Sequence, residues 1–281
     1  MTDTLARSYA ENLRQRFGQP FIVENKPGAS LMIGTNAVAK AAPDGYTILL
    51  TVTTHSQNPH LQPSLPYDSL KDFVPLARTN LTQGVLAVNA DLGVGTVQEF
   101  AAAAKSGKFS YGTFGVGTSP HIFGRVLEDH IGVDMLHVPF KGEAPVLQDI
   151  LAGQITTSFL STMVALPHIR SGRLNALAVS GNSRAAQMED VPTLRETGRD
   201  GFEMMLWTGF LAPAGTPPDV VASLSDALVD ATNDAVIKKR IQDAGLIPAP
   251  LGSEEFAKYM AQQHAGWGDA IRKTGITLAG S

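Results

Sequence analysis

The chain has 281 residues, 43% of them hydrophobic and 17% charged, with a net charge of −4 and an isoelectric point near 6.0. This apolar content excludes a disordered chain, and the acidic balance gives no sign of a nucleic-acid or anionic-membrane partner. Cysteine is absent, which excludes disulfides, thiolate catalysis and iron–sulfur clusters.

The first half of the chain alternates between helix and strand patterns. Apolar residues at Leu5, Tyr9, Leu13 and Phe17 recur every four positions and predict a first helix that ends at Gly18. We expect strands at 21–24, 46–52, 73–77 and 84–88, helices at 31–41 and 96–104, and a polar loop at 53–59. Thr96 and Glu99 have the spacing of a capping box, which supports the helix that follows them.

The same alternation continues to the C-terminus. We expect strands at 109–112, 135–138, 155–160, 174–179 and 208–212, with helices at 122–131, 144–152, 163–170, 219–231, 234–244 and 253–273. Strands that alternate with helices of about ten residues are typical of a parallel or mixed α/β sheet. We therefore predict an α/β protein of two lobes, with the chain crossing between them twice.

Four loops share a small, hydroxylic or glycine-rich composition: 27–30, 53–56, 115–119 and 140–142. In open α/β sheets, ligands bind where such loops meet helix N-termini, and the free N–H groups there favour an anion. Serine and threonine hydroxyls also donate to a carboxylate without carrying charge. Any one of these loops is typical of an ordinary turn, but together they favour a pocket for a small anion.

Enzyme and metal signatures are absent from the sequence. It has no nucleophile elbow, Walker A loop or H-E-x-x-H helix, and its seven histidines are not paired at metal-ligand spacing. We therefore expect no catalysis, no metal and no cofactor. One alternative stays open, an α/β hydrolase or transferase with His55 or His121 as its base. Trp207 precedes a predicted strand, and two roles stay open for its ring: packing in the core, or stacking against a ligand.

Several ordered segments carry a resemblance to a known family. They are VENKPGA at 23–29, AAPDGYT at 41–47, LPYD at 65–68, DFVP at 72–75, HVPFKGEAP at 137–145, GQI at 153–155, DVPT at 190–193, WTG at 207–209 and APAGTP at 212–217. Together they resemble the Bug/TctC family, the extracytoplasmic solute receptors of tripartite tricarboxylate transporters (TTT). The match runs from the first helix to the last.

The resemblance implies a two-lobed type II periplasmic-binding-protein (Venus flytrap) fold, with mixed sheets flanked by helices. Lobe 1 would comprise 1–95 with 205–281, lobe 2 would comprise 96–204, and the ligand cleft would lie between them. The implied function is capture of a small carboxylate in the periplasm by a monomer that delivers it to the membrane permease subunits of a TTT system. A sensor that presents its closed form to a histidine kinase is the alternative, because both functions use the same ligand-bound shape.

Mapped onto this chain, the family's ligand contacts fall on loops of both lobes. They are Thr2, Ala29, Ser30, Thr53, Thr54, His55, Gly117, Thr118, Ser119, His121, Phe140 and Lys141, and we add Ser158, Ser161 and Trp207 as candidates. Lys141 is the main cation among them, which favours a mono- or dicarboxylate over a tricarboxylate. Nucleic acid is not an expected partner.

This sequence departs from the family pattern at three places. The family has a signal peptide, a first strand and a Pro/Gly-rich loop before the Thr2-Asp3 pair. The resemblance therefore implies that the first strand of lobe 1 is missing here. The expected periplasmic location is inferred from the family. Ser30 and Leu31 stand where the family has two glycines. Leu160 stands where the family has an aspartate, which argues against an acid at that position recognising an amino group of the ligand.

Overall fold

The computed structural model describes residues 2–62 and 64–276, which contacts divide into two compact units. Unit 1 is Met1–Leu81 with Trp207–Gly268, and unit 2 is Thr82–Leu206 with Asp269–Ser281. The lobes expected from the sequence, 1–95 with 205–281 and 96–204, stay a prediction. The chain passes between these units three times, because the last helix contributes to both.

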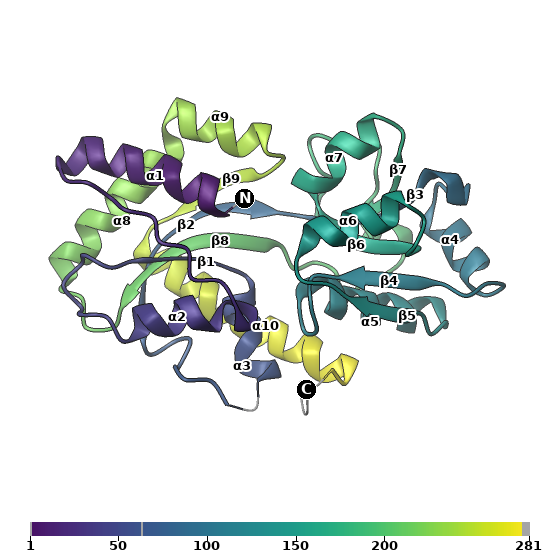
Figure 1. Ribbon diagram of the computed structural model, residues 1–281, viewed down its shortest axis with the longest axis horizontal. Helices are drawn as coiled ribbons and strands as arrows, with labels where there is room; N and C mark the ends of the chain where they lie inside the picture. The colour runs from purple at the N-terminus through teal and green to yellow at the C-terminus, as the bar shows by residue number, and fades with distance from the viewer. Residues whose placement is uncertain (1, 63, 277–281) are drawn as a thin grey trace. The chain divides into compact units, whose positions relative to one another are not determined.

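Unit 1 contains a four-stranded sheet in the order β1 (Leu49–Val52), β8 (Leu206–Pro213), β2 (Phe73–Thr82) and β9 (Ile247–Leu251) (Figure 1). β1 pairs with β8 and β9 pairs with β2, both antiparallel. Phe210 and Ala212 of β8 enter one apolar cluster while Leu211 enters another, as the two-residue period of a strand requires. The sheet therefore has a core on each face.

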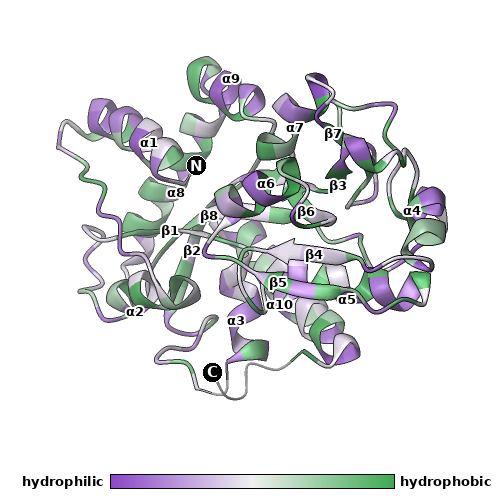
Figure 2. Ribbon diagram, turned by 45° about the vertical axis from the view of Figure 1, so that its right-hand side comes forward, coloured by the Kyte–Doolittle hydropathy of each residue, from purple (hydrophilic) through white to green (hydrophobic). Residues whose placement is uncertain are grey.

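Helices cover both faces of this sheet. α1 (Thr2–Phe17), α8 (Pro218–Asn233) and α9 (Ala235–Asp243) belong to the first cluster, whereas α2 (Met32–Ala39) and α10 (Ser253–Thr274) belong to the second. The first helix is confirmed: α1 buries Leu5, Tyr9 and Leu13 and ends before Gly18. Figure 2 shows hydrophilic residues along the outer side of α1 and hydrophobic residues on α8 beside it.

Unit 2 contains a five-stranded mixed sheet in the order β5 (Leu136–Pro139), β4 (Ser110–Thr113), β6 (Thr157–Ser161), β3 (Gly84–Asn89) and β7 (Leu174–Val179). β4 runs parallel to β5 and β6, and β3 runs antiparallel to β6 and β7. The helices of this unit are α4 (Val97–Ala104), α5 (Ser119–Ile131), α6 (Glu143–Leu151) and α7 (Thr162–Arg170). The predicted capping box is present, with Thr96 and Glu99 bonded reciprocally. The expected α/β class with mixed sheets is confirmed.

Two expected elements are wrong. Residues 21–24 form no strand, because a strand needs a hydrogen-bonded neighbour and the described residues provide none beside them. The polar segment expected as a loop at 53–59 is instead mostly helix, α3 (Thr54–Leu61). Four of its polar side chains, His55, Ser56, Gln57 and Asn58, are buried, and the Asn58 amide donates to the Ser30 carbonyl at 2.9 Å. Short 3-10 turns lie at Ala29–Leu31, Ala90–Leu92 and Arg195–Thr197.

Within the described ranges, no helix is both long and apolar enough to cross a membrane.

Candidate functional site

Three helices of unit 2 begin at one edge of its sheet. β4, β5 and β6 are parallel, so their C-terminal ends lie at the same edge, and each strand leads into a helix: β4 into α5, β5 into α6 and β6 into α7. The first N–H groups of a helix have no partner inside the helix and carry partial positive charge. This edge therefore favours an anion, and the candidates Gly117, Thr118, Ser119, Phe140, Lys141 and Ser161 all lie there.

The loop between β4 and α5 is held in one conformation by its own hydroxyls and glycines. Gly115 and Gly117 have φ angles of 136° and 78°, which other residues rarely adopt. The Thr118 hydroxyl donates to the Gly115 carbonyl at 2.7 Å, and the Gly117 N–H donates to Nδ1 of His121 at 3.0 Å. The loop is thus ordered by its own contacts.

His121 supports this loop from the first turn of α5. Its ring stacks on His137 with centroids 3.9 Å apart and planes 9° apart, and Nε2 of His137 is 2.7 Å from the Thr113 hydroxyl. Burial, with the neighbouring His137 and Arg125, lowers the pKa of His121 to about 4, so the ring is neutral at pH 7. Because Nδ1 accepts the Gly117 N–H, the proton of the neutral ring is on Nε2.

A partly buried carboxyl group that the sequence analysis missed, that of Glu143 in the first turn of α6, contacts the end of β6. Glu143 accepts hydrogen bonds from both the backbone N–H and the hydroxyl of Ser161, the latter at 3.0 Å. Burial raises the pKa of Glu143, and the two bonds from Ser161 oppose that rise. The Ser161 donors are therefore already engaged by a carboxyl group of the chain itself. An acidic residue directly before a predicted helix was the signal that could have indicated it.

The remaining unit 2 candidates differ in exposure. The Phe140 side chain packs against the core of unit 2, and its N–H donates to the Thr113 carbonyl at 2.9 Å. Lys141 is exposed and forms no ion pair with any residue that the structure describes. Ser158 is buried, and its hydroxyl lacks a hydrogen-bond partner among the described residues.

The exposed loop of unit 1 is strained. Ala29, Ser30 and Leu31 have φ angles of 46°, 51° and 72°, a left-handed conformation that costs non-glycine residues about 1–2 kcal/mol each. Asn58 of α3 holds the loop through the Ser30 carbonyl, so the loop lies against α3. Strain of this kind gathers at ligand sites, which is consistent with the expectation for Ala29 and Ser30.

Three unit 1 candidates lie in the core. The Thr53 hydroxyl accepts a hydrogen bond from the backbone N–H of Trp207 at 2.7 Å. The Trp207 ring packs edge-on against Phe256, with centroids 5.4 Å apart. His55 is 1% exposed, its Nε2 is bonded to the Ser69 carbonyl at 2.9 Å, and burial lowers its pKa to about 4. These contacts give all three residues a structural role in unit 1.

Thr54 and Thr2 are the other unit 1 candidates. Thr54 is partly exposed in the first turn of α3. Thr2 is exposed at the start of α1, where it lines a cavity inside unit 1 that Leu31 also lines. The structure thus gathers one set of candidates at the sheet edge of unit 2, and places the loop carrying Ala29 and Ser30 against α3 in unit 1. Across the residues described, no three acidic or histidine side chains are grouped as a metal site would require.

Comparison with known proteins gives matches along almost the whole chain. The family profile described as "Tripartite tricarboxylate transporter family receptor" matches residues 5–276. The solved periplasmic binding protein BugD is 32% identical, with a TM-score of 0.88 over 99% of this chain and 94% of BugD.

Two of the solved structures that are more than 25% identical contain a small carboxylic acid. An R. palustris protein with adipate is 27% identical, with a TM-score of 0.90 over 98% of this chain and 94% of its own. MatC from Rhodopseudomonas palustris with bound malate is 31% identical, with a TM-score of 0.84 over 96% of this chain and 94% of MatC. This chain is similar to all three proteins over most of their length.

Proposed function

The chain belongs to the tripartite tricarboxylate transporter receptor family, whose members are periplasmic solute-binding proteins, and on that premise we propose that it captures a small dicarboxylate in the periplasm. The observation that carries the proposal is the sheet edge of unit 2, where three helices start around a loop of glycines and hydroxyls. The bound malate and adipate of two relatives, both dicarboxylates, support the ligand class.

The mechanism follows from the donors at that edge. Backbone N–H groups at the start of α5, with the Ser119 hydroxyl, would hold one carboxylate by charge-assisted hydrogen bonds. Each such bond contributes about 1.5–3 kcal/mol, so three or four account for micromolar binding after the ordering cost. Thr54, Ala29 and Ser30 are the candidates of unit 1, and no residue is assigned a chemical step.

Site variants test this proposal. We expect Ser119→Ala to weaken binding of the preferred dicarboxylate about tenfold, and Thr54→Ala to weaken it less, because α3 offers one helix start and the unit 2 edge offers three. Titration calorimetry measures both, and Ser106→Ala, an exposed serine after α4, is the matched control. Unchanged affinity in Ser119→Ala and Thr54→Ala would contradict this placement of the site.

We further propose delivery of the ligand to membrane permease subunits of a tripartite transporter. The family to which the chain belongs supports this partner. Cells that lack this protein should lose uptake of the radiolabelled dicarboxylate and regain it with the parent gene. Normal uptake, with only a lost transcriptional response to the ligand, would contradict delivery and support the sensor function.

A further inference from the structure

An exposed turn of unit 1 has a backbone conformation that suits glycine at three residues that are not glycine. Gly28, Ala29, Ser30 and Leu31 all have positive φ angles, from 118° at Gly28 to 46° at Ala29. We call these four residues the turn. All four are exposed, so packing of their side chains in a core does not impose this conformation. A run of left-handed residues persists only where the surrounding structure holds it.

Two buried side chains hold the carbonyl groups of the turn. The Asn58 amide of α3 donates to the Ser30 carbonyl at 2.9 Å. The Thr35 hydroxyl of α2 donates to the Leu31 carbonyl, also at 2.9 Å. Both side chains belong to residues that are 2% exposed. In a trans peptide the C=O and N–H groups point in opposite directions, so the bond from Asn58 also directs the Leu31 N–H away from α3.

Asn58 is itself held in place by its surroundings. Burial raises the pKa of Tyr67, and the side chains of Asn58 and Thr35 beside its hydroxyl oppose that rise. The Tyr67 ring stacks on His55 of α3 with centroids 6.2 Å apart, and Phe73 packs edge-on against both rings. The Asn58 amide is therefore presented to the turn from a packed and rigid base.

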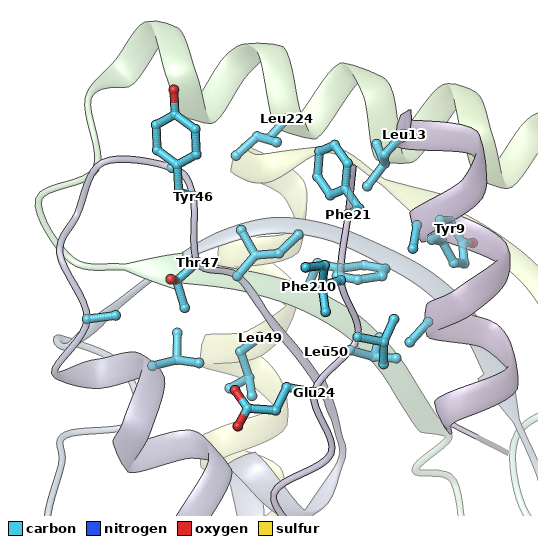
Figure 3. A pocket seen from close by; sticks show the side chains of 18 of the residues that line it. Tyr9, Leu13, Phe21, Glu24, Tyr46, Thr47, Leu49, Leu50, Phe210 and Leu224 are labelled. Atoms are coloured by element: carbon cyan, nitrogen blue, oxygen red, sulfur yellow. The ribbon is translucent and has the colours of Figure 1, made fainter. Parts of the chain in front are cut away.

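The bond from Asn58 lies on the α3 side of the turn. On another side the turn borders a cavity of about 1230 Å³ inside unit 1, which Leu31 and Thr35 line and which Figure 3 shows with Leu49 and Leu50 in its wall. Ser30 and Asn58 are not part of that lining. Asn58 thus acts on the turn from the interior of the protein, where water does not compete for its amide.

This arrangement has a consequence for ligand binding. Asn58 is too buried to touch a ligand, whereas Ala29 and Ser30 are exposed candidates for contact with one. Without the bond from Asn58, serine and leucine in the turn would return to the negative φ angles that such residues prefer. The turn would then have to be reordered each time a ligand binds, and that cost lowers affinity.

We propose that Asn58 is a positioning residue for the dicarboxylate. It holds the turn in its left-handed conformation in the free protein, so that Ala29 and Ser30 are in place before the ligand arrives. The need for it lies in the sequence of the turn, because serine and leucine do not keep these φ angles unaided and glycine does. This inference rests on the proposed function, in which Ala29 and Ser30 are candidates of unit 1.

A matched pair of leucine variants tests the role of the Asn58 amide. Asn58→Leu keeps a side chain of similar shape and removes the donor, and we expect it to weaken binding of malate or adipate at least tenfold by titration calorimetry. Asn175 is the control, because its amide donates to the Val94 carbonyl at 2.8 Å at the end of the unit 2 sheet opposite Ser161. Asn175→Leu should bind within twofold of the parent.

Glycine in the turn separates positioning from a general loss of structure. In a protein with Ser30→Gly and Leu31→Gly, the turn reaches its φ angles without strain. We expect Asn58→Leu to weaken binding threefold or less in that background, against tenfold in the parent. In the ligand-free parent, the Cα and Cβ chemical shifts of Ser30 should report a left-handed residue, and in Asn58→Leu they should not.

Three results would overturn the proposal. An equal loss of affinity in both backgrounds would show that Asn58 does not act through the turn. Unchanged affinity in Asn58→Leu would show that the turn needs no positioning. Ser30 chemical shifts that stay left-handed in Asn58→Leu would show that other contacts hold the turn.

Two further outcomes are decided in advance. If Asn58→Leu does not fold, Thr35→Val removes only the hydroxyl that holds the Leu31 carbonyl. It should weaken binding about threefold in the parent and not at all in a Ser30→Gly, Leu31→Gly background, and an equal loss in both would overturn the proposal. If the parent binds neither malate nor adipate, the proposed function fails and the ligand role of Asn58 fails with it, whereas the Ser30 shifts still decide whether Asn58 holds the turn.

Discussion

At the scale of single residues, backbone strain at Ser30 is the clearest departure from ordinary geometry. Its φ of 51° is one that glycine adopts freely, and its side chain forms no hydrogen bond in the described part of the chain. We expect Ser30→Gly to raise the free energy of unfolding by about 0.5–1 kcal/mol. This is the relief of strain in the folded state minus the cost of the extra backbone entropy that glycine gives the unfolded chain.

Chemical denaturation measures this change. The matched control is Ser223→Gly on the exposed face of α8, where glycine should destabilise by about 0.5 kcal/mol. A loss of stability in Ser30→Gly equal to that of the control would show that the loop is not strained.

Glu143 is the second residue whose substitution has an expected effect, in this case on ligand affinity. Its carboxyl group already occupies the Ser161 donors, so a ligand carboxylate at this edge meets a like charge. We expect Glu143→Gln to tighten dicarboxylate binding about tenfold, or about 1.4 kcal/mol, by calorimetry at pH 7. Asp129→Asn on α5 makes the same change in net charge at an exposed position and should leave affinity unchanged.

The pH dependence of this effect has a definite sign. Because burial raises the pKa of Glu143, lowering the pH neutralises it, and dicarboxylate affinity in the parent should rise as the group takes up its proton. Glu143→Gln should lose that rise. Binding that weakens in Glu143→Gln would mean that the carboxyl group orders Ser161 for the ligand.

Residue roles could be predicted from the sequence only where the chemistry is local. The glycines and hydroxyls of 115–119 lie in the loop that was expected, at the end of β4, since turn chemistry is encoded in neighbouring residues. His55 was expected beside a loop and is instead bonded to Ser69 in the core, and Glu143 was not selected at all. Both depend on contacts between segments far apart in sequence.

At the scale of elements, α3 is an unusually polar helix, and its buried histidine makes the free energy of unfolding depend on pH. Its His55 is neutral in the folded state with a pKa of about 4, whereas the unfolded chain has the ordinary value of 6.5. Between these values the unfolded state binds the proton and the folded state does not, so stability is full above pH 6.5 and falls as the pH decreases toward 4. The fall is about 2 kcal/mol between pH 7 and pH 5.

Urea unfolding at pH 7 and pH 5 tests this dependence. His55→Gln keeps a donor for the Ser69 carbonyl and removes the titrating group, so its loss of stability between the two pH values should be smaller than that of the parent by about 2 kcal/mol. Other histidines contribute equally to both proteins. The same loss in both would show that His55 is not the group responsible.

Elements with strong periodicity could be predicted, and elements that need distant partners could not. The stripe of α1 and the capping box of α4 are encoded within a few turns of helix, and both are confirmed. Residues 21–24 have strand composition, but composition cannot supply the neighbouring strand that pairing needs. α3 was taken for a loop because its polar residues are satisfied by contacts with Ser69 and Ser30 that no local pattern reveals.

At the scale of the whole molecule, each unit has an independent sheet and core, and each carries one set of candidate residues. The α/β class and the family could be predicted from ordered motifs spread along the chain. The division near 81–82 has no linker composition to mark it, because it falls at the end of β2, one continuous strand from Phe73 to Thr82.

Dicarboxylate capture is tested most directly by thermal unfolding of the purified protein with malate, adipate and the uncharged diamide of each. A dicarboxylate at a hundred times its dissociation constant should stabilise the fold by about 2.7 kcal/mol, whereas its diamide should produce no shift, because the proposed site recognises charge through helix N-termini. Equal stabilisation by acid and diamide, or no shift with either acid at millimolar concentration, would contradict dicarboxylate binding by this chain.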